Sequence, residues 1–269
     1  MLKIAYCAGH DLNTAGKRLP AELDAQQTRE WVLNDRVARA FAKAAEAYNV
    51  QLLRTDDATG KTFRAIKDRT AMANQWGADL YIDIHHNAGV NLGSGGGVVA
   101  YCDTDDEAGE AFRDAIYAGV IAAGGLVGNR SQPLQKKRYS TMANAKMPAV
   151  LLECGFMDSS TDAPVILQED YSNRVGRGII EGIARIRDLT KKEEVCQVEV
   201  KVLKKGAKGA TVKAMQMLLE GNGFSCGSKG VDGSFGGDTD KALRAYQSAK
   251  DLQVDGSCGP KTWNSLLGG

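Results

Sequence analysis

The chain has 269 residues, of which 43% are hydrophobic and 25% are charged, a composition typical of an ordinary folded domain or two. Its formal net charge of +1 gives no electrostatic reason to expect nucleic acid or a membrane surface as a partner. The start of the chain lacks the pattern of a signal peptide, and no run is apolar enough to span a bilayer, so we expect synthesis in the cytoplasm.

Predicted strands and helices alternate through the first 190 residues. The segment 11–28 is polar and is expected to be a long loop, and Thr28 is expected to cap the helix that follows it. The segment 127–147 shows no clear secondary-structure pattern. The alternation predicts an α/β fold whose largely parallel sheet is flanked by helices. The strands are expected at 2–8, 50–54, 79–86, 97–102 and 148–154, and the helices at 30–48, 62–76, 105–123 and 170–189.

A charged stretch, Lys191–Glu194, marks a change of composition and predicts a linker over 191–201. Beyond it lies an internal repeat, because Val231–Thr239 is echoed by Val254–Thr262. Each copy predicts a tight Asp-Gly turn followed by a threonine that caps a helix. Helices expected at 210–222, 239–250 and 260–267 would form a small three-helix domain, and the absence of histidine there favours binding over catalysis.

Two of the three histidines follow directly from an apolar strand as His85 and His86, and the third, His10, follows the first predicted strand. Carboxyl ends of parallel strands meet at one sheet edge, so His10 and a neighbour on the central strand could share a metal ion. A catalytic zinc site usually has three His and Asp/Glu ligands. Glu30, at a helix start, is the leading candidate for the third ligand, and Glu22, in the loop, is its rival. Equally, the Glu30 carboxylate could simply interact favourably with the positive end of the helix dipole.

A zinc hydrolase also needs a carboxylate that carries protons and does not bind the metal. Glu153 follows an apolar strand and should emerge at the same edge of the sheet as the histidines. Cys154, the next residue, should point to the opposite face of the sheet and be inert. Asp83 is expected to be a buried, hydrogen-bonded carboxylate.

Four further expectations concern residues around this edge and the thiols. The ring of His86 should face away from the metal, and Arg69 and Asn74 should tie a helix to the sheet. The glycine-rich stretch at 93–97 is expected to be a turn. The six cysteines have no CxxC spacing and should be mostly buried free thiols, with disulfides open for Cys196, Cys226 and Cys258.

The first 190 residues resemble the zinc-dependent N-acetylmuramoyl-L-alanine amidases of the Amidase_3 type in the order, spacing and flanks of their motifs. The matching residues are Gly9-His10, Glu30, Arg69, Asn74, Ala78–Leu80, Ile84–Ala88 and Pro148–Phe156. The resemblance implies the amidase fold, zinc bound by His10, Glu30 and His85, and Glu153 as the catalytic carboxylate. The chain departs from the family in having Asp11 where a second glycine is usual and Asp83 where serine is usual.

Residues 202–269 resemble peptidoglycan-binding domains of the PG_binding_1 type. The matching residues include Gln216, Asp232-Gly233, Thr239, Gln247, Asp255-Gly256 and Thr262-Trp263. A wall-cutting domain over 1–190 beside a wall-binding one implies peptidoglycan as partner and action on the cell wall, most simply as a phage endolysin. The alternatives are a bacterial autolysin, a zinc peptidase of the stem peptide, and a non-catalytic wall-binding protein. The sequence leaves the oligomeric state open.

Overall fold

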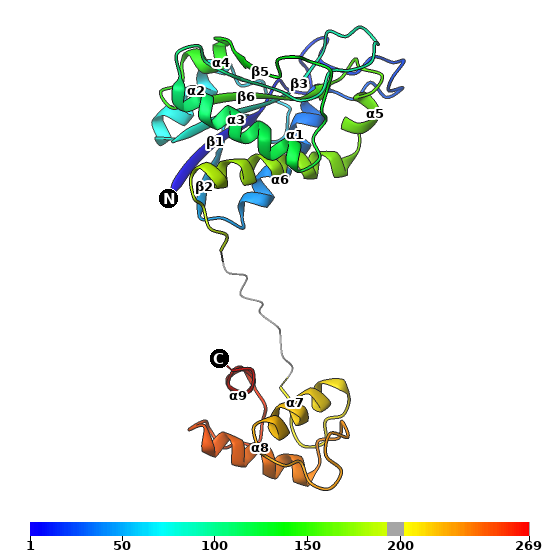
Figure 1. Cartoon of the computed structure of the whole chain (residues 1–269), viewed down its shortest axis with the longest axis vertical. Coiled ribbons are helices and arrows are strands. Elements are labelled where there is room, and N and C mark those ends of the chain that lie inside the picture. The colour runs from blue at the N-terminus through cyan, green and yellow to red at the C-terminus, as the bar shows by residue number, and fades with distance from the viewer. Residues whose placement is uncertain (193–201, 269) are drawn as a thin grey trace. The chain divides into compact units, whose positions relative to one another are not determined.

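A six-stranded sheet organises the N-terminal part of the protein (Figure 1). The computed structural model describes residues 1–192 and 202–268, which fall into two compact units, Met1–Glu193 and Glu194–Gly269. Most of the predicted linker, including Cys196, lies outside the described residues. Within the described ranges, no helix combines the length and the apolar character needed to cross a membrane.

The strands of the sheet run in the order β2-β1-β3-β6-β4-β5, and β4 is antiparallel to β6 while every other neighbouring pair is parallel. The predicted α/β fold with a largely parallel sheet is therefore confirmed. The parallel strands β1, β3 and β6 lie side by side, so their carboxyl ends share one edge. The bounds are β1 Leu2–Ala8, β2 Val50–Arg54, β3 Leu80–Asn87, β4 Val99–Cys102, β5 Leu134–Lys136 and β6 Ala149–Phe156.

Helices cover both faces of the sheet, because successive side chains of each buried strand point to opposite sides. On β3, Ile82 and Ile84 belong to the larger core, under α1, α3 and α6, whereas Tyr81 belongs to a smaller core on the face covered by α2 and α4. The bounds are α1 Glu30–Ala45, α2 Ile66–Trp76, α3 Glu107–Ala122, α4 Ser140–Ala143, α5 Ala163–Ile166 and α6 Glu169–Ile186.

Several predicted boundaries were wrong for local reasons. Thr28 does not cap α1: Arg29 occupies the N-cap position without a side-chain bond, and the Glu30 N–H donates to the Lys17 carbonyl at 3.0 Å. Helix α2 begins at Ile66 and not at residue 62, after Ala65 in an extended conformation. The segment 127–147 contains the short elements β5 and α4, and α5 was not predicted, because elements of three or four residues carry no periodic signal.

The C-terminal unit is built from α7 Ala210–Gly221, α8 Gly237–Ala249 and α9 Pro260–Leu266. Each copy of its repeat is hydrogen-bonded to a buried glutamine from the preceding helix. The Gln216 side chain donates to Asp232, Ser234 and Thr239 and accepts from the Gly233 N–H at 2.8 Å.

The Gln247 side chain repeats this pattern with the second turn. The prediction that the two threonines cap helices was therefore wrong. Thr239 and Thr262 lie inside the first turns of α8 and α9, and they accept from the glutamines. Cys226 and Cys258 are buried free thiols.

Gln247→Ala should destabilise the C-terminal unit strongly, because the fully buried amide of Gln247 serves four groups, including the Gly256 N–H at 3.0 Å. Leaving such groups unpaired costs roughly 2–4 kcal/mol of unfolding free energy. The loss of unfolding free energy can be measured by urea titration of the full chain, with hydrogen exchange of residues 202–268 as the probe of unfolding. The exposed control Gln253→Ala should change stability by less than about 0.5 kcal/mol. Equal stability of the two variants would contradict this account.

Candidate metal centre

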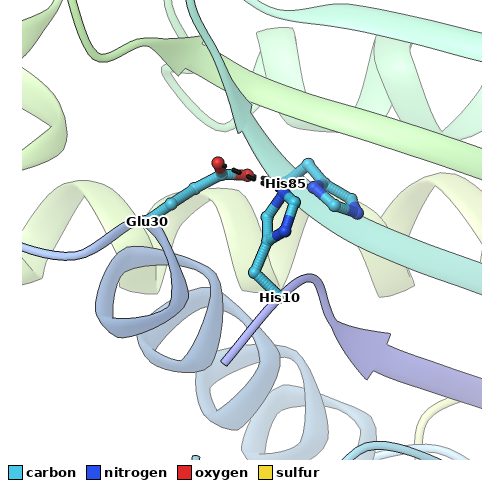
Figure 2. A group of neighbouring side chains, drawn as sticks. All are labelled: His10, Glu30 and His85. Atoms are coloured by element: carbon cyan, nitrogen blue, oxygen red, sulfur yellow. Dashed lines mark hydrogen bonds and ion pairs between the residues drawn. The ribbon is translucent and has the colours of Figure 1, made fainter. Parts of the chain in front are cut away.

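Three side chains from separate segments meet at the carboxyl edge of the parallel strands (Figure 2). His10 follows β1, Glu30 opens α1 and His85 lies near the end of β3. One donor atom from each, a ring nitrogen or a carboxylate oxygen, lies within 4.8 Å of the other two. The two imidazole rings are nearly perpendicular, with centroids 4.9 Å apart. The sheet thus gathers residues that are up to 75 positions apart along the chain.

One oxygen of the fully buried Glu30 carboxylate has three nitrogen neighbours, two of which are fixed N–H donors. Oε1 lies 3.0 Å from Nδ1 of His85, and it accepts from the Asn34 side-chain amide and from the His86 backbone N–H, each at 3.4 Å. Asn34 lies one helical turn after Glu30, and its amide also donates to the Gly9 carbonyl at 3.1 Å. These bonds fix the direction of the Glu30 side chain.

The second oxygen of Glu30, Oε2, is buried and makes no hydrogen bond within the described residues. It faces the His10 Nε2 at 3.4 Å and the Lys17 ammonium at 3.5 Å. A buried anionic oxygen is costly unless a cation or donor meets it. Two histidines and one such carboxylate are the donor set of a catalytic zinc site, so these residues fit a zinc ion.

The backbone around His10 is shaped to bring its ring to this place. His10 adopts a left-handed conformation, with φ 63°, which is uncommon for a residue other than glycine. The buried Arg69 guanidinium supports it by donating to the Ala8 carbonyl at 2.8 Å and to the His10 carbonyl at 2.9 Å. Gly9 leaves room for the neighbouring ring, because a Cβ there would lie 2.1 Å from Cε1 of His85.

Glu153 lies beside His85, as its direct register partner across the β3–β6 pair. Its Oε2 is buried and has no hydrogen-bond partner in the described part of the chain. Immediately after this pair the register shifts, since Asn87 pairs with Phe156, so β6 carries one extra residue. Such bulges commonly lie next to active sites, where they redirect side chains. The arrangement places an unpaired carboxylate next to the His10–Glu30–His85 cluster.

Burial and neighbouring charges shift the pKa values of the side chains in and beside the cluster. Burial opposes ionisation of Glu30, but the hydrogen bond and charge of His85 outweigh it and lower the pKa of Glu30 to about 2. Burial lowers the pKa of His10 to about 4. Burial would also lower the pKa of His85, but Asp83 and Glu30 raise it well above its usual range. Burial raises the pKa of Glu153 to about 7, although the charge of His85 opposes this.

The other residues considered from the sequence take supporting places. Glu22 is exposed and is not part of the cluster. The ring of His86 lies on the opposite side of β3, where Nδ1 contacts the Asn34 amide oxygen at 2.8 Å. Asn74 ties α2 to the segment before β6 through the Asn144 carbonyl and the Lys146 N–H. Cys154 is buried in the larger core, on the face opposite Glu153, as expected.

Sequence reasoning missed two residues at this centre. Asn34 carries a signal that could have found it, because it lies four residues after Glu30 on one helix face. Lys17 carries no such signal, since its approach to Glu30 depends on the path of an irregular loop.

Comparison with known families decides the relationship of the chain. Residues 4–185 match the family model described as N-acetylmuramoyl-L-alanine amidase. The chain belongs to this amidase family. Residues 208–266 of the amidase match a second model, described as a putative peptidoglycan binding domain.

The amidase resembles both bacterial and phage proteins. It is 29% identical over 197 residues to the N-acetylmuramoyl-L-alanine amidase CwlM of Bacillus licheniformis, with 71% of each chain covered. It is 32% identical over 148 residues to the endolysin of Bacillus phage SPP1, and this match covers 53% of the chain and only 51% of the endolysin.

The fold of the amidase also matches a solved structure. The catalytic domain of CwlV, an N-acetylmuramoyl-L-alanine amidase from Bacillus (Paenibacillus) polymyxa var. colistinus, aligns with a TM-score of 0.61 at 22% identity. The alignment covers 71% of this chain and 100% of the other. The likeness establishes a shared fold for the N-terminal unit.

Gly9→Ala should displace the His85 ring, because the added methyl would overlap it at 2.1 Å. We expect the amidase to stay folded but to bind zinc at least about tenfold more weakly, since the ring of a candidate ligand would be misplaced. Competition with a chromogenic chelator measures the affinity. Gly221→Ala is the matched control, because nothing lies within 4 Å of that added Cβ. Unchanged zinc affinity in Gly9→Ala would show that the ring has room to move.

Glu153 should impose a pH dependence on folding in chelator-treated protein. Burial raises its pKa from 4.5 to about 7, so the folded state holds a proton that the unfolded chain releases. This contribution to stability is fully present below pH 4.5 and is lost as the pH rises through about 7. The wild type should therefore lose unfolding free energy relative to Glu153→Gln over this range. Denaturant titrations at both ends of the range test it, and parallel pH profiles would contradict it.

Proposed function

We propose that the chain is a zinc-dependent hydrolase of the amide bond between the lactyl group of N-acetylmuramic acid and L-alanine in peptidoglycan. His10, Glu30 and His85 would hold the zinc ion, and Glu153 would be the catalytic carboxylate. The observation that carries the proposal is the buried, unbonded Glu30 oxygen facing His10, with Glu153 in register beside His85. Membership of the amidase family names the bond.

The chemistry divides between the ion and the protein. A bound zinc ion supplies a Lewis acid that polarises a carbonyl and lowers the pKa of water towards about 7. Glu153 then takes the proton of the attacking water and passes it to the leaving nitrogen of L-alanine. A carboxyl whose pKa is raised towards neutrality by burial is suited to both accepting and giving this proton. Glu30, which accepts from the Asn34 amide and the His86 backbone N–H, would keep the ligand set in one geometry.

The C-terminal unit would hold the enzyme on its substrate. A domain that binds the wall raises the local concentration of the catalytic unit at the wall without adding contacts at the cleaved bond. Peptidoglycan is therefore the proposed partner of both units. The match of residues 208–266 to a peptidoglycan-binding family supports this division of labour.

We further propose that the protein acts as a phage endolysin, made in the cytoplasm and released to the wall through a membrane pore. The likeness to the phage endolysin supports this origin. The five cysteines in the described residues are all buried free thiols, which suits synthesis in a reducing compartment. A bacterial enzyme of cell separation or sporulation is the alternative, and the likeness to CwlM favours it equally.

Production of the protein in bacterial cells, followed by measurement of lysis and export, separates these two origins. An endolysin held inside the cell should lyse it only after the membrane is permeabilised. A bacterial enzyme with its own export route should reach the wall or the medium in intact cells. Fractionation of cells before and after addition of a pore-forming agent distinguishes the two.

Mass spectrometry of fragments from purified cell walls tests the activity itself. The proposed enzyme should release stem peptides with a free L-alanine amine and leave glycan with a free lactyl carboxylate, and chelator should abolish release. Fragments that retain L-alanine on muramic acid would instead identify a stem-peptide peptidase. Binding to walls without any release would identify a non-catalytic wall-binding protein.

Glu153→Gln should bind one equivalent of zinc and lose hydrolysis by roughly 10²–10⁴-fold, because an amide cannot relay the proton. His85→Ala should lose the metal. Turbidity of purified walls and metal analysis of the same samples measure both effects. The exposed control Glu107→Gln, at the start of α3, should keep full activity and full zinc. Full activity in Glu153→Gln would remove this residue from the mechanism.

A further inference from the structure

Asp83 lies two residues before His85 on β3, so both side chains project from the same face of the sheet. The side chain is 4% exposed, and its Oδ1 lies 3.2 Å from Nε2 of His85. The other ring nitrogen of His85, Nδ1, lies 3.0 Å from Glu30. The imidazole is therefore held between two carboxylates, one on each nitrogen.

We propose that Asp83 is a positioning residue that keeps the proton of His85 on Nε2 and so presents Nδ1 to the metal ion. This inference rests on the proposed function, since it assumes that His85 is a ligand. A neutral imidazole carries one N–H, and the nitrogen without it is the one that binds a metal. A carboxylate that accepts the Nε2–H fixes this tautomer and makes the ring a stronger ligand.

The surroundings of Asp83 hold its carboxylate in place. Cys7, its register partner on β1, donates its thiol to the same Oδ1 at 2.9 Å. The Cys7 sulfur also contacts the Tyr81 hydroxyl at 3.1 Å, so the network extends along the face of the sheet. Because β1 and β3 are paired strands, Asp83 cannot turn away from His85 without breaking these contacts.

An ionised carboxylate at position 83 selects one tautomer of the His85 ring. A serine hydroxyl can donate or accept, so it does not select one tautomer of the imidazole, whereas an ionised carboxylate only accepts. A buried carboxylate that only completed the core would be costly without a cationic or donor partner. The geometry thus assigns to Asp83 a role in orienting the His85 ring.

Zinc affinity tests the role, measured by competition with a chromogenic chelator. Asp83→Asn and Asp83→Ser should bind zinc about 10–100-fold more weakly than the wild type, as removal of such a partner usually does. Asp79→Asn is the matched control, because Asp79 is exposed, directly precedes the same strand, and its side chain accepts from the Lys3 backbone N–H at 2.8 Å. Its affinity should not change.

Nitrogen NMR of the zinc-loaded wild type gives an independent readout that needs no variant. His85 should show a protonated Nε2 and a metal-bound Nδ1. A proton on Nδ1, or unchanged affinity in Asp83→Asn while the wild type binds zinc, would overturn the role of Asp83 alone. A wild type that binds no zinc would overturn the metal site and this inference together.

Discussion

The Glu30 carboxylate is the group on which the centre depends. It is fully buried at the start of α1, and its two oxygens face two histidines, one that follows β1 and one on β3. Desolvating a carboxylate is expensive, and only cations and donors on both oxygens offset that cost. The Asn34 amide and the His86 backbone N–H donate to Oε1, while Oε2 makes no hydrogen bond in the described residues and lies beside Lys17 and His10. The same residue thus organises the cluster electrostatically and offers an oxygen that could bind the proposed ion.

Hydrogen bonds to the backbone and the pairing of strands hold the side chains of the cluster in place. The Arg69 side chain donates to the carbonyls of Ala8 and His10, and these bonds support the left-handed conformation of His10. The paired strands β1, β3 and β6 set the spacing between His85, Asp83 and Glu153. Sites built on paired strands are more precise than sites built on loops. Catalytic geometry here is a consequence of sheet register.

The sequence predicted the sheet and the approach of two histidines at one edge, because apolar strands that end in polar residues carry a strong local pattern. The choice of Glu30 over Glu22 as their partner came from the resemblance to the amidase family. It did not predict the short elements in 127–147, which have no periodicity, or the approach of Lys17, which depends on an irregular loop. The expected threonine caps were wrong because buried glutamines, 23 and 15 residues from Thr239 and Thr262, bind those hydroxyls. Local propensity does not report such distant partners.

The central claim is that two imidazoles and one carboxylate share a single zinc ion. X-ray absorption at the zinc edge of the purified full chain tests it most directly. The account predicts nitrogen and oxygen neighbours at about 2.0–2.2 Å, with two imidazole contributions and no sulfur. A spectrum with sulfur at about 2.3 Å, or a single imidazole, would place the ion elsewhere and contradict the assignment of His10, Glu30 and His85.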